Sequence, residues 1–223
     1  MSDLLPLFPL PNVVLFPNVF LPLHIFEPRY REMVADALAS DRLIGMVLLK
    51  PGWEHEYEGR PPVYPIGCSG VITHVDQLPD GRYNIVLRGV ERFRIVEEDF
   101  GRAYRLARIE AIAERALEAE DRGVVRRQRS KLELLLASAI ERNLGKAHAG
   151  PRESRGGDAM IPSEMGDEDL VNALAQYLDL EPIEKQALLE KRCLRSRAES
   201  LVELLEMKIM TARVPGGASH FSH

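Results

Sequence analysis

Cysteine is scarce in this sequence. Only two of the 223 residues are cysteine, Cys68 and Cys193. They lie far apart, and neither has a second Cys or a His at the spacing of metal ligands, which argues against a disulfide framework and against a zinc site. We therefore expect no metal, no cofactor and a reducing, cytoplasmic location.

Sequence patterns of nucleotide hydrolysis and serine catalysis are also missing. The Gly145-Lys146 pair lacks the following Ser or Thr and the earlier Gly of a P-loop. In Gly67-Cys68-Ser69-Gly70 the second Gly comes one position too early for a nucleophile elbow. A hydrolase that uses Ser69 or Cys68 is thus a minor alternative to a small buried thiol in a strand.

No charge of one sign dominates. Lys and Arg number 29 against 34 Asp and Glu, so the formal net charge is -5. Such a balance gives no general electrostatic attraction to nucleic acid or to anionic lipid. Proteins or small molecules are the partners that this composition favours.

Long unbroken hydrophobic runs are absent too. Residues 4–34 are among the most apolar of the chain, but they contain prolines at 6, 9, 11, 17, 22 and 28. Asp3 stands where a secretion signal would carry basic residues, and the prolines would break a membrane-spanning helix. We expect a soluble protein with no membrane association.

The prolines predict short extended pieces, at 13–16 and 19–23, on a sheet edge or at the corners of a barrel. A helix is expected from Pro28, which suits the first helical position. Further strands are expected at 43–49, 70–75, 83–87 and 104–112. Leu78-Pro79-Asp80-Gly81 has the residues of a hairpin turn between two of them.

After residue 115 the apolar period changes from 2 to 3.6. Helices are expected at 125–140, 168–178 and 182–190, and a fourth after a capping box formed by Ser196 and Glu199. A connection at 146–167 and a frayed tail at 214–223 complete the chain. We expect an α+β protein with a β barrel at 1–115 and a helical bundle at 116–213.

The loop at 51–65 is the strongest candidate for a binding site. It combines Trp53, Tyr57 and Tyr64 with several prolines. Rigid aromatic side chains beside prolines suit the capture of an extended polypeptide. The alternative is that these aromatics pack as a lid on the barrel.

His24, Glu27 and Arg29 stand where the last extended piece of the opening meets the first helix. We expect them to be structural ties at this junction, with His24 as a hydrogen-bonded histidine.

The opening segments PLFPLPNVVLFP (6–17) and PLHIFEPRY (22–30) closely resemble the start of the substrate-binding N-terminal domain of Lon, the ATP-dependent protease. The resemblance continues through IGMV (44–47), PDGRY (79–83), GVERFR (89–94) and PIEKQALLE (182–190). It implies a PUA-like β pseudo-barrel with one early helix, joined to a C-terminal helical bundle. The chain ends where the ATPase module of Lon would begin, so we expect a free-standing Lon-domain protein without catalytic residues.

The resemblance also implies a non-catalytic module that binds unfolded or partly folded protein clients, as an adaptor or holdase in quality control that could serve a separate protease. The client and the oligomeric state are not predicted. The alternative is RNA binding, because PUA-like barrels can bind RNA and because arginines crowd the strands, with Arg88, Arg92 and Arg94 expected on solvent faces. These arginines are Arg82, Arg88, Arg92, Arg94, Arg102, Arg105 and Arg108. Besides the aromatic loop, a crevice between barrel and bundle is a second candidate contact surface.

Overall fold

The computed structural model describes residues 4–56, 59–146 and 165–211. The chain forms two compact units. The barrel unit comprises Met1–Arg115 and Asn172–Arg192, and the helical unit comprises Ala116–Val171 and Cys193–His223. Residues 172–192 therefore belong to the barrel unit, although the sequence pattern placed them in the helical half.

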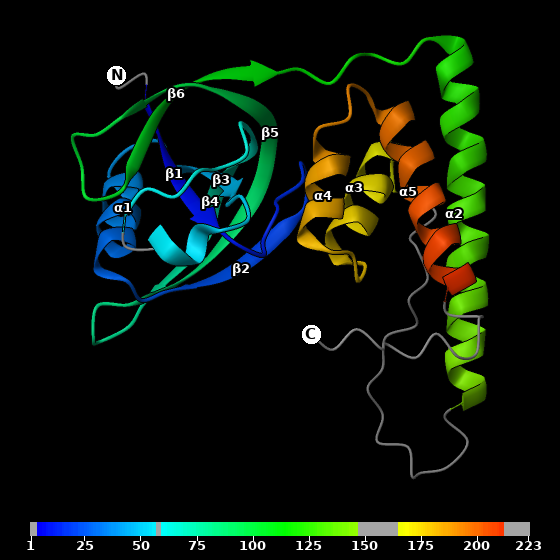
Figure 1. Cartoon of the computed structure of the whole chain (residues 1–223), viewed down its shortest axis with the longest axis horizontal. Helices are drawn as coiled ribbons and strands as arrows, with labels where there is room; N and C mark the ends of the chain where they lie inside the picture. Colours follow the sequence, from blue (N-terminus) through cyan, green and yellow to red (C-terminus); the bar gives the residue numbers. More distant parts are fainter. Residues whose placement is uncertain (1–3, 57–58, 147–164, 212–223) are drawn as a thin grey trace. The chain divides into compact units, whose positions relative to one another are not determined.

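Six strands form the barrel unit's mixed sheet, and five of them close into a ring. The sheet order is β2-β5-β4-β3-β1-β6, and β5 pairs with β6 as well. Because β2 pairs only with β5, it is an edge strand outside the ring (Figure 1). The strands are β1 Leu4–Leu10, β2 Phe20–Ile25, β3 Leu43–Leu48, β4 Ile66–Gln77, β5 Tyr83–Asp99 and β6 Arg105–Ile112. The α+β class and the pseudo-barrel with its early helix are confirmed.

The prolines of the opening occupy positions at which one side of the strand needs no ladder partner. Strand β1 pairs with β6 from Leu4 to Leu7 and with β3 from Leu7 to Leu10. Pro6 and Pro9 thus each have a paired strand on one side only, and Pro22 lies in the edge strand β2. A residue without an N–H is tolerated in such half-paired positions, so the barrel can begin with a proline-rich segment.

The strand expected at 13–16 is wrong. The segment between β1 and β2 has no ladder, yet Phe16 is fully buried. Its N–H donates to Oε1 of Gln176 at 3.2 Å, and the Pro17 carbonyl accepts a hydrogen bond from Nδ2 of Asn172 at 3.3 Å. Side chains of a helix replace the strand partner, which a local apolar pattern could not reveal.

Helix α1 spans Pro28–Leu38, with Pro28 at its first position and Tyr30, Met33, Val34 and Ala37 buried. The expected hairpin also forms: β4 and β5 are joined at 78–82, where Gly81 has a φ of 80°. Both predictions are confirmed. They depended on local features, namely an apolar period and a residue that tolerates positive φ.

Two helical segments accompany the barrel. Helix α3 spans Asp167–Tyr177 and enters the barrel unit at Asn172, and α4 spans Pro182–Leu189. The side chain and backbone of Glu181 and Glu184 form a reciprocal capping box at the start of α4. This box fixes where α4 begins.

The helical unit is built on α2, Ala119–Lys146, and α5, Leu194–Thr211, which lie side by side (Figure 1). An ion pair joins Asp121 to Arg195 at 2.9 Å near the start of both helices, and a second joins Lys131 to Glu206 at 2.8 Å farther along both. The two helices therefore run parallel. Among the described helices, none combines the length and the apolar character needed to cross a membrane.

The expected capping box at Ser196 and Glu199 is wrong. Helix α5 begins earlier, at Leu194, and the Ser196 hydroxyl donates to the Cys193 carbonyl at 2.9 Å from inside the first turn. Most of the connection expected at 146–167 and the tail at 214–223 lie outside the described residues.

Gly89 provides a test of how the opening segment is held. Its N–H donates to the Val19 carbonyl at 2.9 Å, its carbonyl accepts the N–H of Asn18 at 3.0 Å, and a Cβ here would collide with the carbonyl oxygen of Phe16. Gly89→Ala should therefore lower the free energy of unfolding by about 2 kcal/mol or more. Urea denaturation measures this change.

The control is Gly123→Ala in α2, where the nearest atom to a new Cβ is 3.6 Å away. This variant should be neutral or more stable by about 0.5–1 kcal/mol, because Ala favours a helix over Gly. Equal effects of the two substitutions would contradict the close approach at Gly89.

Candidate functional site

An apolar groove of about 200 Å³ lies beside Trp53 in the barrel unit. Four parts of the chain form it. They are Pro11 just after β1, the segment from the end of β3 to the 3-10 turn η1 (Trp53–Glu56), the return of the loop at Tyr64, and the start of α4. Among the residues that the structure describes, no charged side chain lines it. The lining residues are Pro11, Leu48, Leu49, Pro51, Trp53, Tyr64, Pro182 and Ile183.

Backbone hydrogen bonds beyond β3 hold the aromatic side of the apolar groove. The N–H of Tyr64 donates to the Leu48 carbonyl at 2.9 Å, and that of Lys50 donates to the Pro62 carbonyl at 2.8 Å. Gly52 then turns the chain with a φ of 89°, which a residue with a Cβ rarely adopts. The loop is therefore pinned at both ends, and Trp53 and Tyr64 are brought to one surface.

The other side of the apolar groove is the N-terminal end of α4. Ile183 is 51% exposed although it is a large aliphatic residue. Two side chains tie α4 to the barrel: Gln186 donates through Nε2 to the Ile66 carbonyl at 3.0 Å, and Arg92 donates to the carbonyl of Leu189 at 3.0 Å and to that of Lys191. Ile183 is therefore an exposed apolar residue on a helix that is fixed to the barrel.

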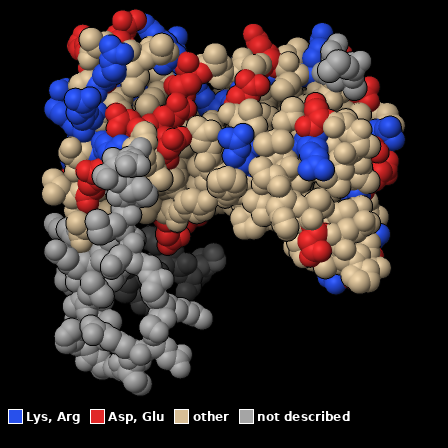
Figure 2. Space-filling view, turned by 180° about the vertical axis from the view of Figure 1, so that it is seen from behind, with Lys and Arg blue, Asp and Glu red and all other residues tan. Residues whose placement is uncertain are grey.

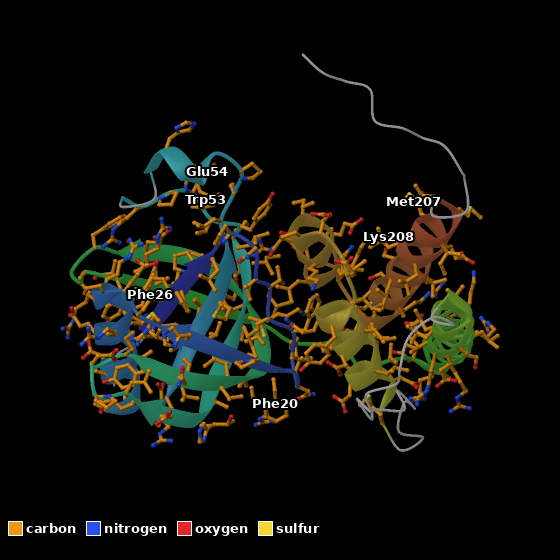
Figure 3. The ribbon with its side chains drawn as sticks, turned by 90° about the horizontal axis from the view of Figure 1, so that it is seen from below. Phe20, Phe26, Trp53, Glu54, Met207 and Lys208 are labelled. Carbon is orange, nitrogen blue, oxygen red and sulfur yellow. The ribbon has the colours of Figure 1, made fainter. Side chains whose placement is uncertain are left out.

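Trp53 and Tyr64, both predicted as binding residues, line the same groove and are half-buried. Figure 3 shows Trp53 and the exposed Phe20 at opposite sides of the barrel in that view. The third predicted residue, Tyr57, lies outside the described residues.

Sequence reasoning missed Leu48, Leu49 and Ile183, which supply the aliphatic surface. Leu48 and Leu49 belong to a buried run, and Ile183 follows a helix-starting proline; neither pattern marks a residue as part of a binding surface.

The three predicted junction residues form two separate sets of contacts. Glu27 and Arg29 pair at 2.9 Å at the start of α1. His24 instead contacts β5 and the hairpin turn, with Nδ1 2.7 Å from Oδ1 of Asn84 and Nε2 3.2 Å from Nη1 of Arg82. All three lie in structural contacts, but His24 connects β2 to the hairpin rather than to the helix.

The arginines behind the RNA-binding alternative are mostly engaged. Arg92, expected on a solvent face, is only 2% exposed and is paired with Glu114 at 3.2 Å, because α4 covers its strand position. Arg105 is also buried, and three others pair with carboxylates: Arg82 with Asp80, Arg102 with Glu32 and Asp36, and Arg108 with Glu97. On the face in Figure 2, basic and acidic side chains of the described residues are interspersed.

The minor hydrolase alternative gains no support from the positions of its residues. Cys68 is fully buried and Ser69 is 3% exposed. The Ser69 hydroxyl donates to the Glu91 carbonyl at 3.2 Å, so it serves the sheet. In the part of the chain that the structure describes, no group of three or more His, Cys, Asp or Glu could hold a metal ion.

The model of the ATP-dependent protease La (LON) substrate-binding domain matches residues 4–207. The chain belongs to this family. Lon protease 2 of Myxococcus xanthus is 28% identical over 210 residues, which cover 92% of this chain and 24% of that protein. Lon protease 2 of Desulfotalea psychrophila is 29% identical over 223 residues, 96% of this chain and 26% of that protein. The chain therefore spans about a quarter of the length of these curated relatives.

Two solved structures share the fold of the Lon substrate-binding family. The N-terminal domain of Mycobacterium avium complex Lon protease matches with a TM-score of 0.61 and 17% identity, over 91% of this chain and 98% of that one. The Lon N-terminal domain protein from Xanthomonas campestris matches with a TM-score of 0.54 and 21% identity, over 95% of this chain and 99% of that one. The resemblance seen in the opening residues is confirmed.

Arg92 offers a test of what holds the α4 side of the groove. Its removal leaves the carbonyls of Leu189 and Lys191 and the Glu114 carboxylate without their buried cationic partner. Arg92→Ala should therefore cost about 3–5 kcal/mol of unfolding free energy. Urea denaturation measures it. The matched control is Arg108→Ala, whose pair with Glu97 is exposed and should contribute about 0–1 kcal/mol. A cost for Arg92→Ala as small as that of the control would refute the bracing role.

Proposed function

We propose that this chain is a non-catalytic module that binds exposed apolar segments of unfolded or partly folded polypeptides in the apolar groove. The observation that carries the proposal is the joining of Trp53 and Tyr64 with exposed Ile183 in one uncharged groove. Membership in the Lon substrate-binding family supports it. An adaptor or holdase role in cytoplasmic quality control, delivering clients to a separate protease, is part of the same proposal.

The size of the groove suits a segment and not a folded surface. A volume of about 200 Å³ is smaller than pockets for drug-sized ligands, which run from about 300 to 1,000 Å³. It accommodates one or two side chains of an extended chain. Each fully buried aliphatic or aromatic side chain contributes about 1.5–3 kcal/mol. Binding of one segment should therefore be weak and insensitive to client sequence.

Rigidity compensates in part for this small contact. Three prolines line the groove, and the aromatic loop is pinned by backbone hydrogen bonds. Proline and aromatic side chains lose little conformational entropy when they become ordered. Less of the contact energy is therefore lost in fixing the groove around its client.

The test uses Trp53, the only tryptophan of the chain, as its own reporter. Adding a permanently unfolded protein, reduced and alkylated, should shift Trp53 emission to shorter wavelength, because the client excludes water from the indole. Ile183→Asp, on the opposite wall, should weaken this binding by about 10-fold.

The control is Phe20→Asp, which places the same charge at an exposed aromatic residue outside the groove (Figure 3). It should leave client affinity within about twofold, a change under 0.5 kcal/mol. An unchanged Trp53 emission, or equal losses in the two variants, would contradict binding at the groove.

A further inference from the structure

A second cavity, of about 220 Å³, lies in the barrel unit and is lined by three arginines from separate parts of the chain. Arg29 comes from α1, Arg60 from the loop after η1, and Arg105 from the start of β6. Tyr30, Tyr104 and Leu49 also line it. We call it the cationic cavity.

Arg60 is held in place by neutral groups. Its guanidinium donates to the carbonyls of Asp99 at 3.2 Å and Arg102 at 3.1 Å, and it lies over the ring of Phe100 at 4.4 Å from the centroid. Among the ion pairs of the described residues, none involves Arg60. Carbonyls and an aromatic ring orient a guanidinium but do not neutralise its charge.

The other two arginines each pair with a carboxylate. Arg29 pairs with Glu27 at 2.9 Å, and Arg105 pairs with Glu98 at 3.3 Å. Asp36 is already shared between the Tyr104 hydroxyl, at 2.6 Å, and Arg102. Among the described residues, the ion pairs of the three cavity arginines involve two carboxylates, those of Glu27 and Glu98.

The electrostatics of Arg105 agree with this arrangement. Burial lowers the pKa of Arg105 most, Glu98 opposes that change, and the nearby charges of Arg60 and Arg29 lower the pKa further. The guanidiniums therefore repel one another through the cavity. A bound anion would relieve that repulsion.

The cationic cavity adjoins the apolar groove. Leu49 lines both, and Pro9 and Pro11, two residues apart on the same segment, line one each. The cavity volume of about 220 Å³ is close to that of the groove and is enough for a carboxylate and its hydration.

We propose that the cationic cavity binds a carboxylate of the polypeptide whose apolar side chain occupies the groove, either a chain-terminal carboxylate or that of an Asp or Glu side chain. The inference rests on the proposed function and deepens it. Arginine forks match carboxylates geometrically, and hydrogen bonds to charged groups are stronger than neutral ones. Clients with a carboxylate next to apolar residues would be preferred over clients with apolar residues alone.

The experiment compares three N-acetylated, fluorophore-labelled peptides with the same Leu- and Phe-rich sequence. One ends in a free carboxylate, one in an amide, and one in an amide after a single added Glu. Fluorescence anisotropy gives their affinities for the full chain. The free-acid form, the Glu form or both should bind about 10-fold more tightly than the plain amide. If the free-acid peptide gains affinity, the cavity binds a chain-terminal carboxylate; if the Glu peptide gains affinity, it binds a side-chain carboxylate.

Arg60→Gln should reduce this preference to within about twofold, whereas Arg60→Lys, which keeps the charge without the fork, should retain part of it. The matched control is Arg94→Gln, an exposed arginine of β5 outside the cavity, which should keep the full preference. Far-ultraviolet circular dichroism and urea denaturation confirm that the variants fold.

Equal affinities of the three peptides for the native chain would overturn the proposal, and so would a preference that survives Arg60→Gln. In either case, a shift of Trp53 emission on adding the amide peptide would still support the apolar groove as the client site. Absence of binding by all three peptides would overturn both proposals.

Discussion

The guanidinium of Arg92 is buried in the wall of the barrel, where an arginine is tolerated only if its donors are occupied. The Leu189 carbonyl at the end of α4, the Lys191 carbonyl just after it and the Glu114 carboxylate occupy them. This requirement makes α4 part of the barrel unit, although the helix follows the strands by many residues. The groove wall at Ile183 exists because the helix is held from its other end. The apolar groove thus depends on a buried polar contact at the far end of the helix that forms one of its walls.

The apolar groove and the cationic cavity share a further constraint, namely a backbone with little freedom. Prolines 6 and 9 fit β1 because each faces a partner on one side only, and the chain leaves β1 through Pro11 into the groove. The same residues that shape the barrel therefore shape the contact surface. When a site buries few side chains, its low flexibility matters more than its buried area. The entropy cost of ordering a flexible site would otherwise cancel the free energy gained from the contacts.

Local patterns predicted much of this fold and less of its site. Helix α1 and the β4–β5 hairpin were predictable because their signals, a 3.6-residue period and a Pro-Asp-Gly turn, act over a few residues. Residues 13–16 were mistaken for a strand because Gln176, far along the chain, supplies the hydrogen bond that a ladder would give. Arg92 was expected in solvent because alternation along β5 cannot show which helix covers it. Trp53 and Tyr64 stood out by chemistry, whereas Ile183 joined them only through tertiary packing.

The edge strand β2 leaves one side of the sheet open to pairing with another chain. An open edge can recruit an extended client as an extra strand and begin an aggregate. Here Pro22 removes a donor from the middle of that edge strand, and the Tyr177 hydroxyl occupies the carbonyl of Phe20 at 2.9 Å. Both features make β2 a poor template for an added strand, so the proposed binding of a client would involve side chains of the groove and not the open edge of the sheet.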